Sequence, residues 1–481
     1  MAEKLFLYVL TDTHYISDKM WEEGDPINGR EKGDQIAIKS TPQILRTFFD
    51  KILADDEVKH VLITGDLINS GDKQSHLDFI QELKVLTDAG KHVYVTTATH
   101  DYAGEGEDGD ENIFHATYYG KDECRPAERV GKKDLLPLYY DFGPAQSDSV
   151  HETGSYSLPI QEGYRLIAIN DNGNGRSHCG LFDEGFEWLV NEIHKAKAKG
   201  ELVFLAVHHP VIPPWEVFRA AADFEMFGGY ERLRQIMCEE NVKVIFTGHT
   251  HVQGIKKYTD EQGRFFYDVT TTALPSANGK MRRVIFDKDA GTCDIKSIGI
   301  ETIKGWDTKG LSAHDYISQL NFGGALEQAF AVADTDWEGF LDKASGVLPV
   351  DKLKKHPHLA KWGVKKFNGL KMSTVAKLAK KKYSGLTKEE LETLKGEKAK
   401  NVVFTVMDHI QGGNAPYTPD TLEYKALHGV TARADHLMKL VHFDLSKKLP
   451  GIHSLSELAD PFFYNNRTGD DDTILIEGLE S

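Results

Sequence analysis

Histidine and aspartate residues, whose side chains bind transition metals, follow five apolar stretches of this sequence. The apolar stretches have β-strand character and read LFLYVL, HVLIT, HVYVT, LVFLAV and VKVIF. The polar groups that follow them are Asp12-Thr13-His14, Gly65-Asp66, Thr99-His100-Asp101, His208-His209 and Gly248-His249-Thr250-His251. Carboxylate oxygens and imidazole nitrogens together suit zinc, manganese or iron better than calcium. The pattern therefore predicts a site for transition metal ions.

The spacing of these residues predicts that their side chains meet. Side chains two residues apart in an extended segment lie on one side of it, which applies to Asp12 with His14 and to His249 with His251. A parallel α/β sheet brings the loops at the carboxyl ends of its strands into one crevice. A single Asp-x-His or His-x-His arises often by chance, whereas five such loops after five apolar stretches do not.

Helical patterns separate these stretches over the first 300 residues, at 41–53, 76–90, 182–199 and 230–240. Such alternation predicts a mostly parallel sheet with helices on both faces. Three later segments, RFFYDVTTTAL, RRVIFD and CDIKSIGI, predict antiparallel strands. We expect an α/β fold, a two-sheet sandwich flanked by helices, as the catalytic domain over residues 1–305. Residues 306–481 are expected to form a mainly α-helical C-terminal domain.

Composition excludes several classes of protein. The 481 residues are 40% hydrophobic and 27% charged, as in ordinary globular proteins. No stretch approaches the roughly 18 apolar residues of a membrane span, so no membrane partner is expected. The N-terminus enters a strand without a signal-peptide pattern. The four cysteines lie far apart without CxxC spacing, which favours a reducing cytosol and predicts a cytoplasmic protein.

Charge is unevenly distributed along the chain. The net charge of −17 argues against a nucleic-acid partner, because phosphate contacts need clustered Lys and Arg. Residues 354–400, however, hold 14 Lys against 4 Glu and no Asp. This segment is either the solvated face of a helical domain or a surface for an anionic partner or substrate.

The order Asp-x-His, Gly-Asp, His-Asp, His and Gly-His-x-His resembles the motif set of the calcineurin-like metallophosphoesterases. The resemblance covers residues 5 to about 300. The segment GDLINSG at 65–71 is similar to the version found in the bacterial cyclic-nucleotide phosphodiesterase-like branch. The resemblance implies the metallophosphoesterase sandwich fold. It also implies hydrolysis of a phosphodiester, a cyclic nucleotide or a related small-molecule diester.

The resemblance further implies a centre of two divalent or trivalent transition metals, Mn, Fe or Zn. The first would be held by Asp12, His14, Asp66 and His251. Asp66 would bridge to the second metal, which His208 and His249 would help to hold. A hydroxide bridging the two metals would attack phosphorus. His100 would neutralise the transition state or protonate the leaving group, and Asp101 would orient its ring.

Thr99 departs from the family pattern, which has asparagine as a ligand of the second metal at this position. Three explanations stay open. Thr99 or a water completes the second site with weaker affinity, another side chain such as Asn69 or an acid of residues 105–111 replaces the asparagine, or the second metal is lost. The pair His100-Asp101 is retained, which argues against decay.

Other residues near these motifs have simpler explanations. His209 is expected to position substrate or to pack rather than to bind metal. Residues 171–175, DNGNG, are most simply a turn.

Alternatives to a phosphodiesterase also stay open. They are a phosphomonoesterase with the same centre, a weakly active or regulatory binding protein with a degraded second metal site, and, less favoured by the acidic charge, a nuclease. The sequence does not specify the physiological substrate or the oligomeric state.

Overall fold

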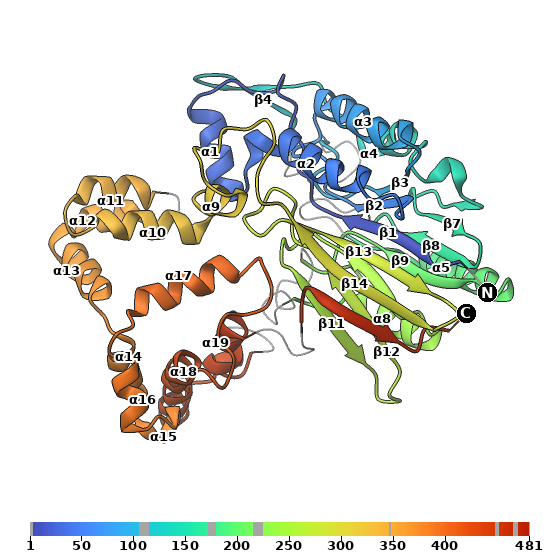
Figure 1. Cartoon of the computed structure of the whole chain (residues 1–481). Helices are drawn as coiled ribbons and strands as arrows, with labels where there is room; N and C mark the ends of the chain where they lie inside the picture. The colour runs from blue at the N-terminus through green and yellow to red at the C-terminus, as the bar shows by residue number, and fades with distance from the viewer. Residues whose placement is uncertain are drawn as a thin grey trace. The chain divides into compact units, whose positions relative to one another are not determined.

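The computed structural model describes residues 3–104, 115–171, 179–214, 225–345, 348–447, 452–464 and 470–480. The chain divides into two compact units, both drawn in Figure 1. The first contains the described residues up to His314 together with residues 470–480. The second contains the described residues from Asp315 to residue 464.

The first sheet of the first unit has six strands in the order β15-β14-β13-β1-β2-β3. Parallel pairing joins β1 (Leu5–Leu10), β2 (His60–Thr64) and β3 (His92–Thr96). Antiparallel pairing adds β13 (Lys280–Asp287), β14 (Thr292–Gly299) and β15 (Thr473–Glu477). The three parallel strands are the ones whose carboxyl ends carry the first three ligand loops.

The second sheet has seven strands in the order β11-β12-β10-β9-β8-β7-β6. Its parallel strands are β8 (Tyr164–Ala168), β9 (Leu202–Ala206), β10 (Val244–Thr247) and β12 (Phe265–Thr270). Its antiparallel strands are β6 (Ser149–Val150), β7 (Tyr156–Gln161) and β11 (Gly254–Thr259). A separate two-stranded sheet pairs β4 (Thr117–Tyr119) with β5 (Cys124–Pro126).

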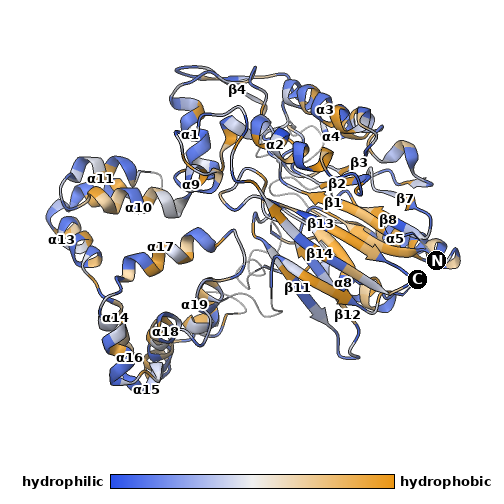
Figure 2. Ribbon diagram, viewed as in Figure 1, coloured by the Kyte–Doolittle hydropathy of each residue, from blue (hydrophilic) through white to orange (hydrophobic). Residues whose placement is uncertain are grey.

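The two large sheets pack face to face over one apolar core. Leu7, Val9 and Phe286 of the first sheet share this core with Phe204 and Phe246 of the second. The Phe204 and Phe286 rings stack with centroids 4.7 Å apart. The strands are accordingly the most hydrophobic ribbons of the unit in Figure 2. The predicted α/β class with a two-sheet sandwich is confirmed.

Helices cover the outer faces of the sheets. On the second sheet, α5 (Asp183–Ala198) and α8 (Tyr230–Glu239) bury Leu189 and Leu233 against strand residues such as Leu205. Beside the first sheet lie α2 (Thr41–Leu53) and α3 (Lys73–Asp88). Asp72 begins α3 by accepting a hydrogen bond from the Ser75 backbone N–H at 2.7 Å. The remaining helical segments are α1 (Asp25–Asp34), α4 (Lys132–Leu138), and the 3₁₀ turns Ile38–Ser40 and Pro144–Gln146.

The second unit is built from helices, which confirms the predicted helical C-terminal region. After α9 (Ala313–Ser318), one apolar cluster joins α10 (Phe322–Val332), α11 (Trp337–Lys343), α13 (Pro357–Asn368) and α17 (Ala399–His409). A second cluster joins α14 (Met372–Ala379) to α18 (Leu422–Leu440). The other helices are α12 (Val350–Lys355), α15 (Lys381–Ser384), α16 (Lys388–Thr393), the 3₁₀ turn Leu445–Lys447 and α19 (Leu455–Phe463).

The division between the units differs from the predicted boundary at residue 305. The first unit continues to His314, and β15 returns from the far end of the chain to pair with β14. The return is fixed by a side-chain hydrogen bond as well as by the ladder, because the buried Arg282 guanidinium donates to the Asp471 backbone carbonyl at 2.6 Å. The sequence predicts no strand there, since the short run TILIE follows a long helical region.

No helix in the described part of the chain is both long enough and apolar enough to cross a bilayer.

Candidate metal centre

The predicted ligand residues come from the carboxyl ends of strands in both sheets. Asp12 and His14 follow β1, Asp66 follows β2, and His100 comes four residues after β3. The second sheet contributes His208 after β9, and His249 and His251 after β10. The structure brings all of these side chains together in three overlapping groups whose ligand atoms lie within 4.8 Å of one another.

The first group is Asp12, His14 and His251. Asp12 Oδ2 accepts hydrogen bonds from the Thr11 hydroxyl at 2.6 Å and the His249 backbone N–H at 3.0 Å. Its other oxygen, Oδ1, faces His251 Nε2 at 3.3 Å and His14 Nε2 at 3.7 Å. One carboxylate oxygen and two imidazole nitrogens are therefore aimed at one point.

The second group is Asp66, His208 and His249. His208 Nδ1 lies 2.8 Å from the Thr64 carbonyl oxygen, which can only accept, so Nδ1 carries a proton. Its Nε2 faces Asp66 Oδ2 at 3.1 Å. The other Asp66 oxygen accepts from the Thr99 hydroxyl at 3.0 Å and from the His100 backbone N–H at 2.9 Å.

Asp66 also belongs to the third group, with His14 and His100. Its Oδ2 lies 4.0 Å from both His14 Nε2 and His100 Nε2. The carboxylate thus lies between the His14 of the first group and the His208 of the second. This is the position that a shared ligand needs.

Several buried nitrogen and oxygen atoms at the centre show whether these residues suit a cation. Among the described residues, Asp12 Oδ1 is buried without a hydrogen-bond partner, and the buried His208 Nε2 faces only a carboxylate oxygen, Asp66 Oδ2 at 3.1 Å. His14 Nε2 and His251 Nε2 lie only 2.9 Å apart, so their two lone pairs repel unless a proton or a cation lies between them. Buried polar atoms are normally paired. The donor set therefore fits transition metal ions.

The charges of the metal-free centre are held by mutual attraction. Burial opposes ionisation of Asp12 and Asp66, but the neighbouring histidines, His208 foremost, together outweigh it and hold the pKa of both carboxyls well below the usual range. Burial likewise opposes protonation of His208, yet Asp66 and Asp12 raise its pKa well above the ordinary value. Metal binding must displace the His208 proton.

Five of the candidate ligands have left-handed backbone conformations. Their φ angles are all positive: Asp12 48°, His14 40°, Asp66 46°, His249 69° and His251 55°. Such angles are uncommon for residues other than glycine and cost roughly 1–2 kcal/mol each. Strain of this kind is characteristic of functional sites, where it fixes the direction of a side chain.

Glycines before the ligands allow loops of the two sheets to approach. A Cβ at Gly65, where φ is +86°, would lie 2.7 Å from His208 Nδ1. A Cβ at Gly248 would collide with the Thr11 hydroxyl and with Asp12 Oδ2. Each glycine therefore lets one sheet's ligand loop contact a ligand of the other sheet.

Asp101 does not hold the ring of His100, contrary to its expected role. Its Oδ1 accepts from the Leu67 and Ile68 backbone N–H groups at 2.7 and 3.1 Å, and its Oδ2 accepts from Ala98 N–H at 2.7 Å. The His100 ring is held instead through Nδ1, 2.5 Å from the Asn69 carbonyl oxygen. Asp101 thus ties the β2 and β3 loops together through their backbones.

The sequence does not predict a second carboxylate–histidine pair behind the centre. Asp171 Oδ2 accepts from His209 Nδ1 at 2.7 Å and from the His209 backbone N–H at 2.9 Å, and both side chains are fully buried. The His209 ring contacts the His249 ring with centroids 3.9 Å apart. Asp171 therefore positions histidines rather than forming a simple turn; residues 172–175 of the predicted turn lie outside the described residues.

Glu225 is a further acid beside the centre. Its Oε2 lies 3.6 Å from His249 Nε2.

The sequence does contain a signal for Asp171, because Asp171 follows β8 just as the candidate ligands follow their strands. Glu225 has no such signal.

Two of the three explanations for Thr99 can be compared in space. Thr99 itself contacts the second group through Asp66. Asn69 is buried next to His100, and both polar atoms of its side chain lack a hydrogen-bond partner among the described residues. The acids of residues 105–111 lie outside the described part of the chain.

Among curated proteins, Sphingomyelin phosphodiesterase 1 from Caenorhabditis elegans is 27% identical over 214 residues, which cover 40% of this chain and 34% of that protein. The match thus spans about a third of that relative's length.

Two solved structures are similar at low sequence identity. A dimetal phosphatase from Danio rerio is 12% identical with a TM-score of 0.42, covering 61% of this chain and 96% of that chain. Purple acid phosphatase PPD1 from yellow lupin (Lupinus luteus) is 11% identical with a TM-score of 0.39, covering 62% and 52%.

A family model described as calcineurin-like phosphoesterase matches residues 7–253, a range that contains every predicted ligand from Asp12 to His251. Because this match covers more than half of the 481 residues, the chain belongs to the calcineurin-like phosphoesterase family.

Proposed function

We propose that this chain is a metal-dependent phosphodiesterase that hydrolyses a small-molecule diester at a centre for two metal ions. One observation carries the proposal: the Asp66 carboxylate lies between two sets of ligands, 3.1 Å from His208 Nε2 and 4.0 Å from His14 Nε2. A carboxylate shared in this way is what two adjacent cations require.

The ligands divide between two sites. Asp12, His14, Asp66 and His251 would hold the first ion, and Asp66, His208 and His249 would hold the second, with Thr99 beside it. Two ions bound there would polarise the phosphoryl oxygens and lower the pKa of a bound water to near neutrality. Manganese, iron and zinc all suit this mixture of imidazole and carboxylate.

His100 is the proposed proton donor to the leaving group. Its Nδ1 faces the Asn69 carbonyl oxygen, which leaves Nε2 facing the centre, 4.0 Å from Asp66. Burial lowers the pKa of His100 to about 3 in the metal-free chain. An anionic phosphate beside the ring would favour its protonated form. The ring then protonates the departing oxygen.

The preference for diesters is supported by two features. The GDLINSG segment is similar to that of the phosphodiesterase-like branch, and the curated relative is named as a phosphodiesterase.

The four cysteines are free thiols in the structure. On this basis we propose that the protein works in a reducing compartment, the cytoplasm.

Parallel kinetics with bis-p-nitrophenyl phosphate and p-nitrophenyl phosphate test the proposal. We expect a higher kcat/KM for the diester in the presence of Mn²⁺, and loss of turnover on chelation. A clear preference for the monoester would replace the diesterase by a phosphomonoesterase. Fewer than one tightly bound transition metal per chain, with no turnover in added Mn²⁺, would instead favour a regulatory binding protein.

A further inference from the structure

Helix α13 of the second unit exposes two large apolar side chains. Leu359 is 67% exposed and Trp362 is 61% exposed. They are three residues apart and therefore lie on one face of the helix. The opposite face is packed, because Val364 and Phe367 join the apolar cluster around Phe330. The helix thus packs one side against this cluster and has a second apolar side without a protein partner among the described residues.

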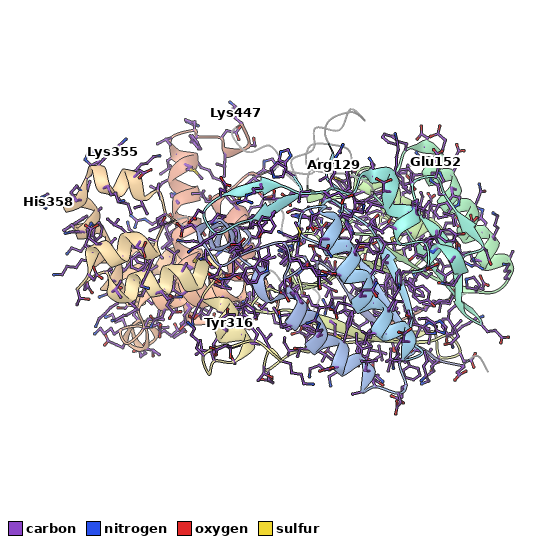
Figure 3. The ribbon with its side chains drawn as sticks, turned by 90° about the horizontal axis from the view of Figure 1, so that it is seen from above. Arg129, Glu152, Tyr316, Lys355, His358 and Lys447 are labelled. Carbon is purple, nitrogen blue, oxygen red and sulfur yellow. The ribbon has the colours of Figure 1, made fainter. Side chains whose placement is uncertain are left out.

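Two lysines lie beside this exposed pair. Lys365 and Lys366 are exposed on the same helix, and Lys366 Nζ lies 6.0 Å from the centroid of the Trp362 ring. Lys361 Nζ lies instead over the Trp337 ring, 5.4 Å from its centroid. Lys355 and His358 lie at the outer edge of these helices in Figure 3. Between Asp351 and Glu389 the sequence has 12 Lys and no Asp or Glu, in a chain whose net charge is −17.

We propose that the exposed face of α13, formed by Leu359, Trp362, Lys365 and Lys366, binds the surface of an anionic lipid bilayer. Amphipathic helices of this composition lie in the membrane interface, with Trp and Leu entering the boundary between headgroups and acyl chains. The lysine ammonium groups reach the lipid phosphates from the same face. No membrane-spanning segment is needed for this mode of binding.

A lipid surface fits this face better than other anionic partners. The lysines alone would suit a nucleic-acid backbone, but that backbone offers no apolar layer for Leu359 and Trp362. An exposed apolar pair with a basic border requires a partner with both layers. The sequence leaves two interpretations of the lysine-rich segment, a solvated face or a surface for an anionic partner. The proposal favours the anionic partner.

Sedimentation of the full chain with vesicles tests the proposal. The probes are vesicles of phosphatidylcholine alone and of phosphatidylcholine with phosphatidylserine in equal parts. We expect binding to the second kind only, and weaker binding in about 1 M salt, where the Debye length falls to about 3 Å. Leu359→Ser with Trp362→Ser should weaken binding about tenfold or more. Lys365→Glu and Lys366→Glu together should weaken it about 30-fold.

A matched control comes from α3 of the first unit, where Leu77 and Val85 are 41% and 49% exposed. Leu77→Ser with Val85→Ser should leave vesicle binding unchanged. Circular dichroism melting should show that the α13 variants fold. Their turnover of bis-p-nitrophenyl phosphate should equal that of the unmodified chain, so failure of lipid binding stays distinguishable from failure of the proposed activity.

Several results would overturn the proposal. These are the absence of binding to the phosphatidylserine vesicles, equal binding to both kinds, and retained binding by the folded α13 variants. If double-stranded RNA displaces the chain from the vesicles and the Leu359 and Trp362 changes leave binding unaltered, the face binds nucleic acid instead. Leu437 and Leu440 of α18 are 50% and 63% exposed. If binding is lost only in the variant Leu437→Ser with Leu440→Ser, the lipid-binding surface lies on α18 and not on α13.

Discussion

The two halves of the metal centre place similar ligands in different surroundings. In the first half, Asp12 fixes one oxygen with two hydrogen bonds and turns the other towards two imidazoles, His14 and His251. In the second half, the carboxylate of Asp66 is shared, and one of its oxygens is taken by Thr99 and His100.

The difference shows where the groups that support the candidate ligands are concentrated. The second half has the weaker set of direct ligands but the more elaborate support behind it. His249 is contacted by His209, which Asp171 holds, and by Glu225 on its other side. Groups that orient a ligand of this kind are typically worth 10–100-fold in metal affinity. We therefore expect two sites of unequal affinity, of which the second depends on its surroundings.

Asp66→Asn should have the largest effect, because the halves have this carboxylate in common. We expect both ions to bind weakly and kcat/KM for the diester to fall by at least about 1,000-fold. Asp78→Asn is the control, since that carboxylate accepts from Ser17 and Lys19 and belongs to none of the ligand groups. Substantial residual turnover of Asp66→Asn would discredit the shared role.

Variants that each remove one imidazole should separate the halves. His251→Ala should release the first ion and His208→Ala the second, with turnover lower by about 100-fold in each case. Metal content measured by mass spectrometry after gel filtration should therefore fall by one ion per chain in both variants. If either change releases both ions, the halves do not bind independently.

Substitutions of Thr99 should affect the second half most, because Thr99 lies beside it. Thr99→Val removes the hydroxyl that donates to Asp66 and should raise the Mn²⁺ needed for half-maximal activity about tenfold. Thr99→Asn should lower that requirement by adding an amide oxygen, and Thr99→Ser, the conservative control, should resemble the unmodified chain. No change on Thr99→Asn would indicate that another group, such as Asn69, already completes the site.

Backbone strain offers the smallest and most local test. At His14, where φ is 40°, glycine should make the metal-free protein more stable than alanine by about 1 kcal/mol. His208 is not among the residues with positive φ. His208→Ala should therefore be more stable than His208→Gly, by about 0.5–1 kcal/mol. Thermal melting of the four variants measures both differences. The same order at both positions would contradict a role for strain.

Much of the candidate site could be predicted because its information is local. Each of the five loops contains at least one candidate ligand, and parallel strands bring their carboxyl ends together whatever the details of the sheet. Asp171 and Glu225 are single acids whose role depends on the final position of His209 and His249. The role of Asp101 was not predictable either, since its partners are backbone N–H groups of a neighbouring loop.

The fold could likewise be predicted where the sequence pattern is local. Alternating strands and helices indicate the parallel part of each sheet, and turn signals indicate the antiparallel hairpin of β13 and β14. The order of strands between sheets and the return of β15 depend on contacts between distant segments, which no local pattern records.

The return of β15 also has a consequence for how the protein is made. β14 ends at Gly299 and β15 begins at Thr473, so the whole helical unit lies between two neighbouring strands of one sheet. During synthesis the catalytic sheet keeps an unpaired edge at β14 until the helical unit has left the ribosome. Such long-range pairing is slow, and an exposed edge invites pairing with other chains. β15 thus closes this edge of the sheet only after the residues of the helical unit have been synthesised.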